Sequence, residues 1–317
     1  MLKIHFLNVG HGDCCLIEFD SNRRAMIDIN RSSTLDNESK DEILKQNTGF
    51  DYFKRKNIID STSNSMELYK ESAGYNIELT DPIEYLEENN ISDIFRFIST
   101  HPHMDHLSGL KTLKNKHILN NIWITKNDFS KDESDLSDSQ KEDWDFYKEC
   151  RDNISSHVDE TKILSIKEGA EGDYYTDDGI YILSPNDELL SISKEKDNKN
   201  LMSTVLLIKY GECKIILAGD AEQENWESII NKYYDEIDNI SILGAAHHGR
   251  DSGYHQEVVK LMNPKYTIVS VGKKPDTDSS NKYRQYSENV YSTRWKGNIV
   301  FECYKSGEIF SDCQYNR

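Results

Sequence analysis

The sequence predicts an α+β fold in which two β-sheets pack face to face and helices cover the outside, an αββα arrangement. Short segments with β-type alternation or apolar runs are concentrated in two halves of the chain. Helix candidates lie among them at residues 82–90 and 222–234; in the first, Thr80 or Asp81 can cap and Pro82 suits the first helical position. We find no internal repeat of about 20 to 50 residues.

The order of these segments gives the expected elements. Polar or glycine-containing turns join the first three strands, which indicates an antiparallel meander at residues 3–8, 14–19 and 24–29. A buried strand is expected at 93–99, the start of a helix at 107–113 and another strand at 118–124. Later strands are predicted at residues 181–183, 203–209, 214–218, 240–245, 266–271 and 298–304.

Two polar stretches interrupt this pattern and are predicted to be insertions, at about 31–80 and 126–170, in a single domain spanning residues 1–317. The first is rich in Asn and Ser. The second contains seven acids against two lysines within residues 131–145, which is typical of a solvated helix. A flap over a site, or a surface that recruits a protein partner, is the alternative.

Composition restricts the function. Lys and Arg total 38 and Asp and Glu total 56, a formal charge of −18, which opposes broad sequence-independent binding to DNA or anionic membranes but allows nucleic acid at one local site. No apolar run approaches the roughly 20 residues of a membrane helix, and the first residues lack a signal-peptide core. The six cysteines contain no CxxC pair. We expect a soluble, cytoplasmic, reduced protein without membrane association.

The most informative segment directly follows the expected strand at 93–99. It places His101, His103, Asp105 and His106 close together. A protein core satisfies one histidine easily, but three with an aspartate at a strand end need a compensating charge. Neutral imidazole and carboxylate are preferred ligands of divalent cations. His101 and His103 can reach one ion and Asp105 and His106 a second, so the segment predicts two divalent ions.

Two later segments also place ligand-type residues at strand ends. Asp220 follows one predicted strand, and the pair His247 and His248 follows another. Asp220 alone would equally suit a helix cap. In this order and spacing, the three segments resemble the metallo-β-lactamase superfamily. The resemblance implies an αββα sandwich, a metal-bridging role for Asp220 and a metal-ligand role for one histidine of the pair.

A finer resemblance is to the ComEC-like branch of that superfamily, the DNA-uptake-associated hydrolases and their soluble relatives. It rests on Phe-Leu-Asn-Val-Gly-His-Gly-Asp at residues 6–13, Asp28, Gly-Asp-Ala-Glu at 219–222 and His-His-Gly at 247–249. His11 stands where the branch usually has glutamine. The resemblance covers residues 1–30, 80–125 and 180–310, and it does not extend to DNA import because the channel part is absent.

One departure concerns the first ion. Classical members have a further histidine before the Gly-Asp strand, whereas this chain has Asn200 in an Asn-x-x-Ser segment. The resemblance then implies that His101, His103 and Asp220 hold the first ion, with Asn200 or water completing the set. Such an oxygen-rich site suits manganese as well as zinc.

The implied activity is hydrolysis by a hydroxide that two metal ions activate. Its metal ligands would be His101, His103, Asp105, His106, Asp220 and His247. Its catalytic residues would be Asp105, which orients the hydroxide, Asp220, which sets the metal spacing, and His248, a neighbouring acid. The sequence leaves open which histidine of the pair is the ligand.

The predicted substrate is a phosphodiester, either nucleic acid or a small nucleotide, bound through Arg250, Ser252, Asn200 and His11. Residues 265–317 carry nine Lys/Arg and six Asp/Glu, a net +3 against −21 for the rest, and interleave these cations with aromatics. Two other functions remain open: a metal-binding sensor or partner-recruiting subunit with vestigial catalysis, and a hydrolase of lactones or thioesters.

Overall fold

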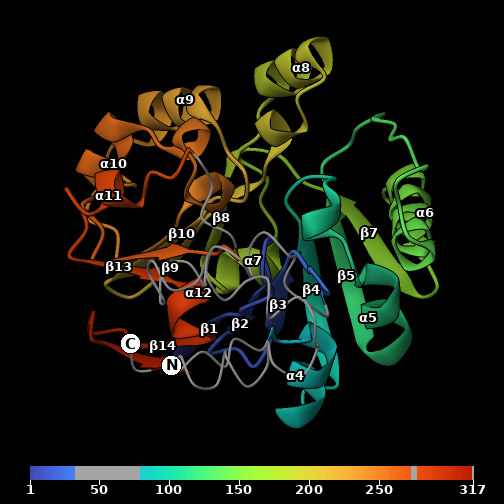
Figure 1. Cartoon of the computed structure of the whole chain (residues 1–317), viewed down its shortest axis with the longest axis horizontal. Coiled ribbons are helices and arrows are strands. Elements are labelled where there is room, and N and C mark those ends of the chain that lie inside the picture. Colours follow the sequence, from blue (N-terminus) through green and yellow to red (C-terminus); the bar gives the residue numbers. More distant parts are fainter. Residues whose placement is uncertain (33–78, 273–276, 316–317) are drawn as a thin grey trace, which may run out of the picture.

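The computed structural model describes residues 1–32, 79–272 and 277–315. Within them, two sheets face each other, with helices on the outside (Figure 1). The larger sheet has nine strands in the order β15-β14-β1-β2-β3-β4-β5-β7-β6, and the smaller has six in the order β13-β12-β11-β10-β9-β8. The predicted αββα sandwich is confirmed.

The bounds of the elements are as follows. The larger sheet contains β1 (Leu2–Phe6), β2 (Cys15–Glu18), β3 (Arg24–Ile27), β4 (Asp93–Ser99), β5 (Ile118–Ile124), β6 (His157–Val158), β7 (Thr161–Ser165), β14 (Ile299–Cys303) and β15 (Ile309–Cys313). The smaller contains β8 (Ile180–Ser184), β9 (Val205–Tyr210), β10 (Cys213–Leu217), β11 (Ile242–Gly244), β12 (Tyr266–Val269) and β13 (Asn289–Ser292). The helices are α4 (Pro82–Glu88), α5 (Leu110–Lys116), α6 (Asp138–Asp152), α7 (Asp173–Asp177), α8 (Asp187–Lys196), α9 (Gln223–Tyr233), α10 (Gln256–Met262), α11 (Ser280–Tyr283) and α12 (Thr293–Lys296).

Three apolar layers hold this arrangement together. Successive strand residues point to opposite faces, so Ile17 packs between the sheets with Ile215 of β10. Its neighbour Leu16 packs on the outer face of the larger sheet, where Trp144 of α6 is buried. Trp226 of α9 belongs to the matching layer outside the smaller sheet. Because both faces of each sheet are covered, most residues of the central strands are apolar, and the buried Arg96 of β4 is an exception.

Strand direction determines where the loops meet. β1, β2 and β3 form the expected antiparallel meander. From β3 onward the pairing through β4 and β5 to β7 is parallel, as is that from β10 through β11 and β12 to β13. Parallel strands bring their carboxyl ends to the same edge of a sheet, and ligands of α/β sheets bind at that edge.

One of the expected helices begins later than predicted. The helix expected from residue 107 begins at Leu110, because Gly109 has a φ of 103° that a helix does not use. Asp143 of α6 then caps α5, accepting hydrogen bonds from the backbone N–H groups of Gly109 and Lys111 at 2.7 and 2.8 Å. α4 begins as expected, with Asp81 as its capping residue.

The acidic stretch is more integrated than a solvated helix. α6 lies within it and buries Trp144, Phe146 and Tyr147 along one face. After it, β7 pairs with β5 and so continues the larger sheet. The stretch at 31–80 lies outside the described residues except for its two ends. None of the helices in the described ranges has both the length and the apolar character needed to span a bilayer.

A buried ion cluster joins the two halves of the chain. Nη1 of Arg96 in β4 lies 2.8 Å from Asp178 Oδ2, and both side chains are at most 1% exposed. Arg23 donates to the same carboxylate from Nε and Nη2, each at 2.8 Å. Burial alone would raise the pKa of Asp178, but hydrogen bonds from Arg23 and Ser21 and the Arg96 charge hold it below its usual value.

Replacing Asp178 by Asn leaves two guanidinium groups without their carboxylate, one of them buried. We expect Asp178→Asn to lower the free energy of unfolding by about 3 kcal/mol, because removing one partner of a buried pair strands the other charge. Urea denaturation measures it as a lower midpoint with an unchanged slope. The control is Asp187→Asn. Asp187 pairs with Lys167, and the two side chains are 79% and 53% exposed, so this change should alter stability little. Equal effects of the two substitutions would contradict this account.

Candidate metal centre

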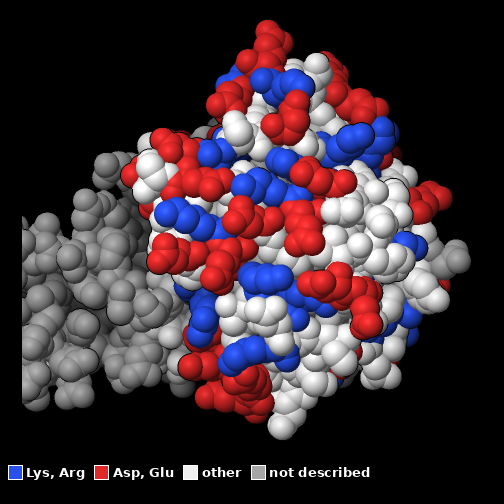
Figure 2. Space-filling model, turned by 90° about the vertical axis from the view of Figure 1, so that its right-hand side faces the viewer, with Lys and Arg blue, Asp and Glu red and all other residues white. Residues whose placement is uncertain are grey.

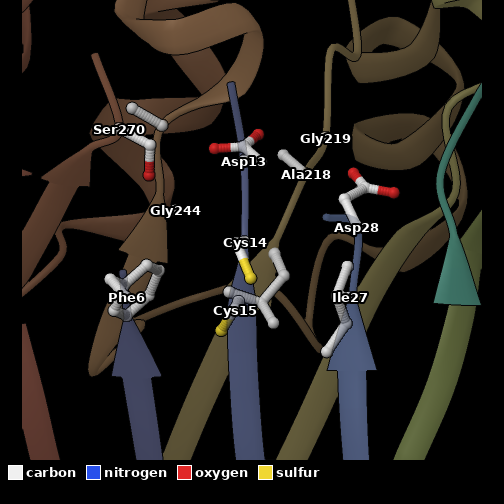
Figure 3. Close-up of a pocket in the computed structure, with 12 residues that line it drawn as sticks. Phe6, Asp13, Cys14, Cys15, Ile27, Asp28, Ala218, Gly219, Gly244 and Ser270 are labelled. Carbon is white, nitrogen blue, oxygen red and sulfur yellow. The ribbon is translucent and has the colours of Figure 1, made fainter. Parts of the chain in front are cut away.

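The predicted ligand residues come together at the edge where the carboxyl ends of β3, β4, β10, β11 and β12 meet. Close backbone contacts join the two sheets there. Gly219 has a φ of 49°, and a Cβ at this position would lie 2.8 Å from Thr100 Cβ, so a side chain would push the sheets apart. Figure 3 shows Asp13 and Asp28 facing Ala218 and Gly219 across this edge. A cavity of about 30 Å³, enough for a water molecule, lies at this level.

Asp220 is the centre of the cluster. Its carboxylate is 3% exposed and has imidazole nitrogens around both oxygens. Oδ2 lies 3.5 Å from His101 Nε2 and 3.7 Å from His247 Nε2. Oδ1 lies 3.3 Å from His106 Nε2 and 3.6 Å from His248 Nε2. Each oxygen of one carboxylate therefore faces two rings from different loops.

The other nitrogen of each of these rings is held from outside. The Nδ1–H of His106 donates to Asp28 Oδ2 at 2.7 Å, and that of His248 to the backbone carbonyl of Ser270 at 3.1 Å. His247 Nδ1 lies 2.7 Å from Ser252 Oγ. Such contacts fix the ring orientation and place the lone pair on Nε2, as in histidines that bind metals.

His101 follows the same rule through a relay. Thr100 Oγ1 donates to Asp28 Oδ2 at 2.6 Å, so it accepts from the Nδ1–H of His101 at 3.0 Å. Asp28 is fully buried, and its other oxygen accepts from the Thr100 backbone N–H at 2.8 Å. One carboxylate thus orients both His101 and His106.

His103 and Asp105 complete the predicted motif. His103 Nδ1 lies 2.8 Å from His101 Nε2, on the same side as Asp220 Oδ2. Asp105 Oδ2 lies 3.3 Å from His248 Nε2 and 3.8 Å from His106 Nε2. Residues of the motif therefore lie near both oxygens of Asp220.

The histidine pair has a strained backbone. His247 and His248 have φ values of 51° and 53°, in the left-handed region that residues other than glycine rarely adopt. The His247 backbone N–H donates to the Gly219 carbonyl at 3.0 Å, which ties this turn to the one bearing Asp220. Strain of this kind persists where the surrounding structure holds it, and it is concentrated at functional sites.

The protonation states differ across the cluster. Burial disfavours a charge on His106 and His248, but the nearby carboxylates, Asp220 first, raise the pKa of His106 well above its usual value and that of His248 to about 9, so these two rings would release a proton on binding a cation. Burial lowers the pKa of His101 well below its usual value and that of His103 to about 4, so both rings are neutral. Burial opposes charge on Asp220 as well, but the imidazoles of His106, His248 and His101 lower its pKa and keep it ionised.

Two buried atoms test whether a metal ion fits. His106 Nε2 and Asp220 Oδ1 have no hydrogen-bond partner among the described residues, although they lie only 3.3 Å apart. Unpaired buried polar atoms are costly. Four groups of ligand atoms within 4.8 Å of one another also occur: His101–His106–Asp220, His11–Asp105–His248, Asp13–Asp220–His248 and Asp13–Asp28–His106. The donor set therefore fits divalent cations.

The four residues predicted to contact substrate have different environments. Arg250 Nη2 lies 3.2 Å from His11 Nε2, beside the cluster. Ser252 is engaged with His247, as described above. Asn200 is buried and donates to Glu222 Oε1 at 3.0 Å, and the same oxygen lies 3.4 Å from His247 Nδ1.

A polar cavity of about 650 Å³ adjoins Asp105 and His11. Hydroxyl and amide side chains contribute much of its wall, including Ser108, Thr112, Ser137, Ser139 and Gln140. Most charged side chains in this wall already have partners. Arg31 Nε lies 2.7 Å from Asp81, and Asp143 caps α5.

Several cations of the C-terminal stretch already have partners within the protein, so they are not all free to bind a phosphate group. Lys282 pairs with Asp251 at 2.7 Å, Arg284 donates to Asn281, and Lys296 lies over the Tyr291 ring. Lys273 and Lys274 lie outside the described residues. A separate cavity of about 430 Å³ is lined in part by Arg284, Tyr291, Arg294, Trp295 and Lys296.

The sequence pattern predicts no individual role for Asp13, Thr100, Glu222 or Ser270. Asp13, Asp28 and Glu222 belong to the segments that carry the family resemblance. The contacts of these residues are with residues distant in sequence, as for Asp28 with His106, so a local pattern carries no signal for them.

Two facing sheets with outer helices, and a histidine–aspartate cluster at the strand ends, define a protein of metallo-β-lactamase-like fold. Among solved structures, CmlA, a diiron β-hydroxylase from Streptomyces venezuelae, is similar, with 11% identity, a TM-score of 0.50 and coverage of 94% of this chain and 53% of that one. The metallo-β-lactamase fold protein YhfI from Bacillus subtilis has 10% identity and a TM-score of 0.45, covering 98% and 100%.

Similarity in sequence is narrower. ComE operon protein 3 of Bacillus subtilis (strain 168) is 26% identical over 215 residues, which are 66% of this chain. The chain spans 23% of that protein's length. No protein-family model matches the chain.

Asp28→Asn tests the positioning of His106. An amide can present its N–H₂ to His106 Nδ1, which would move the ring proton to Nε2 and block the lone pair that faces Asp220. We expect affinity for Mn²⁺ or Zn²⁺, measured by calorimetric titration, to fall about 10- to 100-fold, as when other outer contacts of metal ligands are lost. Asp93→Asn, at a half-exposed carboxylate paired with Arg24, is the matched control. Unchanged affinity in Asp28→Asn would contradict the assignment.

Proposed function

We propose that the protein is a hydrolase dependent on two divalent metal ions, and that its substrates are small phosphodiesters. The observation that supports it most strongly is the set of four imidazoles whose Nε2 atoms face Asp220 while their Nδ1 atoms are held from outside. Imidazoles arranged only for packing would not all turn the same nitrogen toward one buried carboxylate.

The two oxygens of Asp220 divide the ligands into two sets. His101, His103 and His247 would hold the first ion and Asp105, His106 and His248 the second, with Asp220 shared between the two sets. His247 then takes the place of the histidine that is missing before the Gly-Asp strand, and His248 is a ligand as well as a neighbour of Asp105. Under this proposal both histidines of the pair are ligands.

When bound, two such ions lower the pKa of a water molecule and stabilise negative charge on phosphate oxygens. The chain's own residues set the geometry. Asp220 fixes the separation of the two ligand sets, because its oxygens contact both. Asp105, 32% exposed, is the ligand most open to the adjoining cavity and is placed to orient a nucleophilic water. Asn200 acts indirectly, by holding Glu222 against His247.

The surroundings favour a small substrate. Arg250 supplies a cation next to the cluster, and guanidinium groups bind phosphate oxygens in pairs. The adjoining cavity offers hydroxyl and amide groups and few free cations, so it suits an uncharged polar part of a substrate better than a second phosphate. On the face bearing α5 and α6, acidic and basic side chains interleave, and no continuous basic stripe is visible (Figure 2). A long nucleic-acid strand would need such a stripe.

Asp220→Asn tests the catalytic part of the proposal. The amide keeps the shape of the side chain but removes the charge that both ligand sets share. We expect phosphodiester turnover by metal-saturated protein to fall about 100-fold or more, while circular dichroism and the thermal midpoint show a folded protein. Asp187→Asn, on an exposed carboxylate, should retain full turnover. Turnover near the wild-type rate in Asp220→Asn would exclude the two-metal mechanism.

A substrate panel tests the assignment to phosphodiesters. We expect turnover of bis-p-nitrophenyl phosphate, and of dinucleotides or short single strands, in preference to nitrocefin or a thioester, each assayed with manganese and with zinc. Rates on short substrates should depend only weakly on salt, because few phosphates are contacted. Cleavage of the thioester or nitrocefin without any phosphodiester would show that the substrate class is wrong and leave the metal centre intact.

A further inference from the structure

His11 lies in a turn that is fixed against the metal-binding motif. The Asp13 backbone N–H donates to the Asp105 carbonyl at 3.3 Å, and Asn30 Nδ2 donates to the His11 carbonyl at 2.6 Å. Gly12 lies so close to the Asp105 carbonyl that a Cβ would collide with it. From the other sheet, a Cβ on Gly272 would lie 2.9 Å from the His11 nitrogen. The turn therefore has little freedom to move relative to Asp105.

The ring of His11 connects the cluster to a cation. Its centroid lies 4.6 Å from that of His248, at a tilt of 50°. Its Nε2 atom lies 3.2 Å from Arg250 Nη2. A guanidinium group can only donate, so this nitrogen is the acceptor. His11 is thus a neutral ring packed on one expected ligand and accepting a hydrogen bond from Arg250.

Arg250 keeps its charge available. Its buried Nε has no hydrogen-bond partner in the described ranges. Its backbone is held at both sides, because its N–H donates to the His247 carbonyl at 3.0 Å and it forms a β-bridge with Asp278. A guanidinium with unpaired N–H capacity beside a proposed metal centre is expected to bind an anion.

We propose that His11 is a positioning residue, which holds the Arg250 guanidinium beside the metal centre so that its remaining N–H groups bind a phosphate oxygen of the substrate. The inference rests on the proposed function and adds the source of its preference for phosphate. Glutamine, which stands here in the similar branch, also offers an acceptor through Oε1. Alanine does not, and it also removes the ring that packs on His248.

The experiment measures binding of inorganic phosphate to metal-saturated protein by calorimetry, together with KM, kcat and bound metal per chain. In His11→Ala we expect phosphate affinity to fall about tenfold, the size of one lost hydrogen bond that orients a charged group. KM should rise more than kcat falls, and the metal content should stay the same. His11→Gln should restore most of the affinity. The matched controls His157→Ala, on an exposed histidine of β6, and Arg24→Ala, on β3, should behave as wild type.

A double-mutant cycle separates positioning from an independent role. Because His11 acts through Arg250, His11→Ala should have no further effect on phosphate affinity in an Arg250→Ala background. Additive losses would overturn the inference, and so would the loss of one bound metal ion in His11→Ala, which would make His11 a ligand. Absence of phosphate binding by the wild type would also overturn it. Phosphate binding with these variant effects but no phosphodiester turnover would refute the proposed function and leave the positioning role standing.

Discussion

The carboxylate of Asp220 is the group on which the arrangement of the site depends. It is an ionised side chain with almost no solvent contact, and burying such a charge is costly unless partners compensate it. The compensation comes from imidazoles on the loops after β4 and β11, two at each oxygen. The backbone brings these loops within reach through the close approach of Gly219 to Thr100 and the hydrogen bond from His247 to Gly219. A change at any of these contacts alters the surroundings of the same carboxylate.

Rigidity around this carboxylate is obtained at the expense of local backbone strain. Asp28, His247 and His248 all have φ values near +55°, where a Cβ is disfavoured. All three side chains face the cluster, directly or through Thr100. In relaxed backbone conformations these side chains would point elsewhere, so the strain is a condition for the convergence of the rings. Packing of the apolar layers and the buried Arg96–Asp178 pair supplies the stability that tolerates it.

The sequence predicts part of this site well and part of it not at all. The strands at 93–99 and 118–124 have the predicted bounds, because short apolar runs between polar turns are a local signal. The candidate metal-binding motif is also a local signal, since three histidines and an aspartate are close in sequence. The parallel strand β7, hidden after an acidic helix, was missed because its pairing with β5 is not local. The same reason explains why Asp28 and Glu222 received no role: their partners, His106 and His247, are brought to them by the sheet order alone.

Charge distribution connects the fold to the choice of substrate. A chain with a formal charge of −18 repels polyanions at long range, whereas Arg250 and, under the proposed function, the two metal ions would attract an anion at contact distance. Repulsion grows with the number of phosphates in the substrate, whereas the attraction is confined to one place. A substrate with one phosphodiester would therefore experience most of the attraction and little of the repulsion. Each further phosphate would add more electrostatic repulsion than favourable contact. Under the proposed function, the same acidic surface would exclude long nucleic acids while admitting a small phosphodiester.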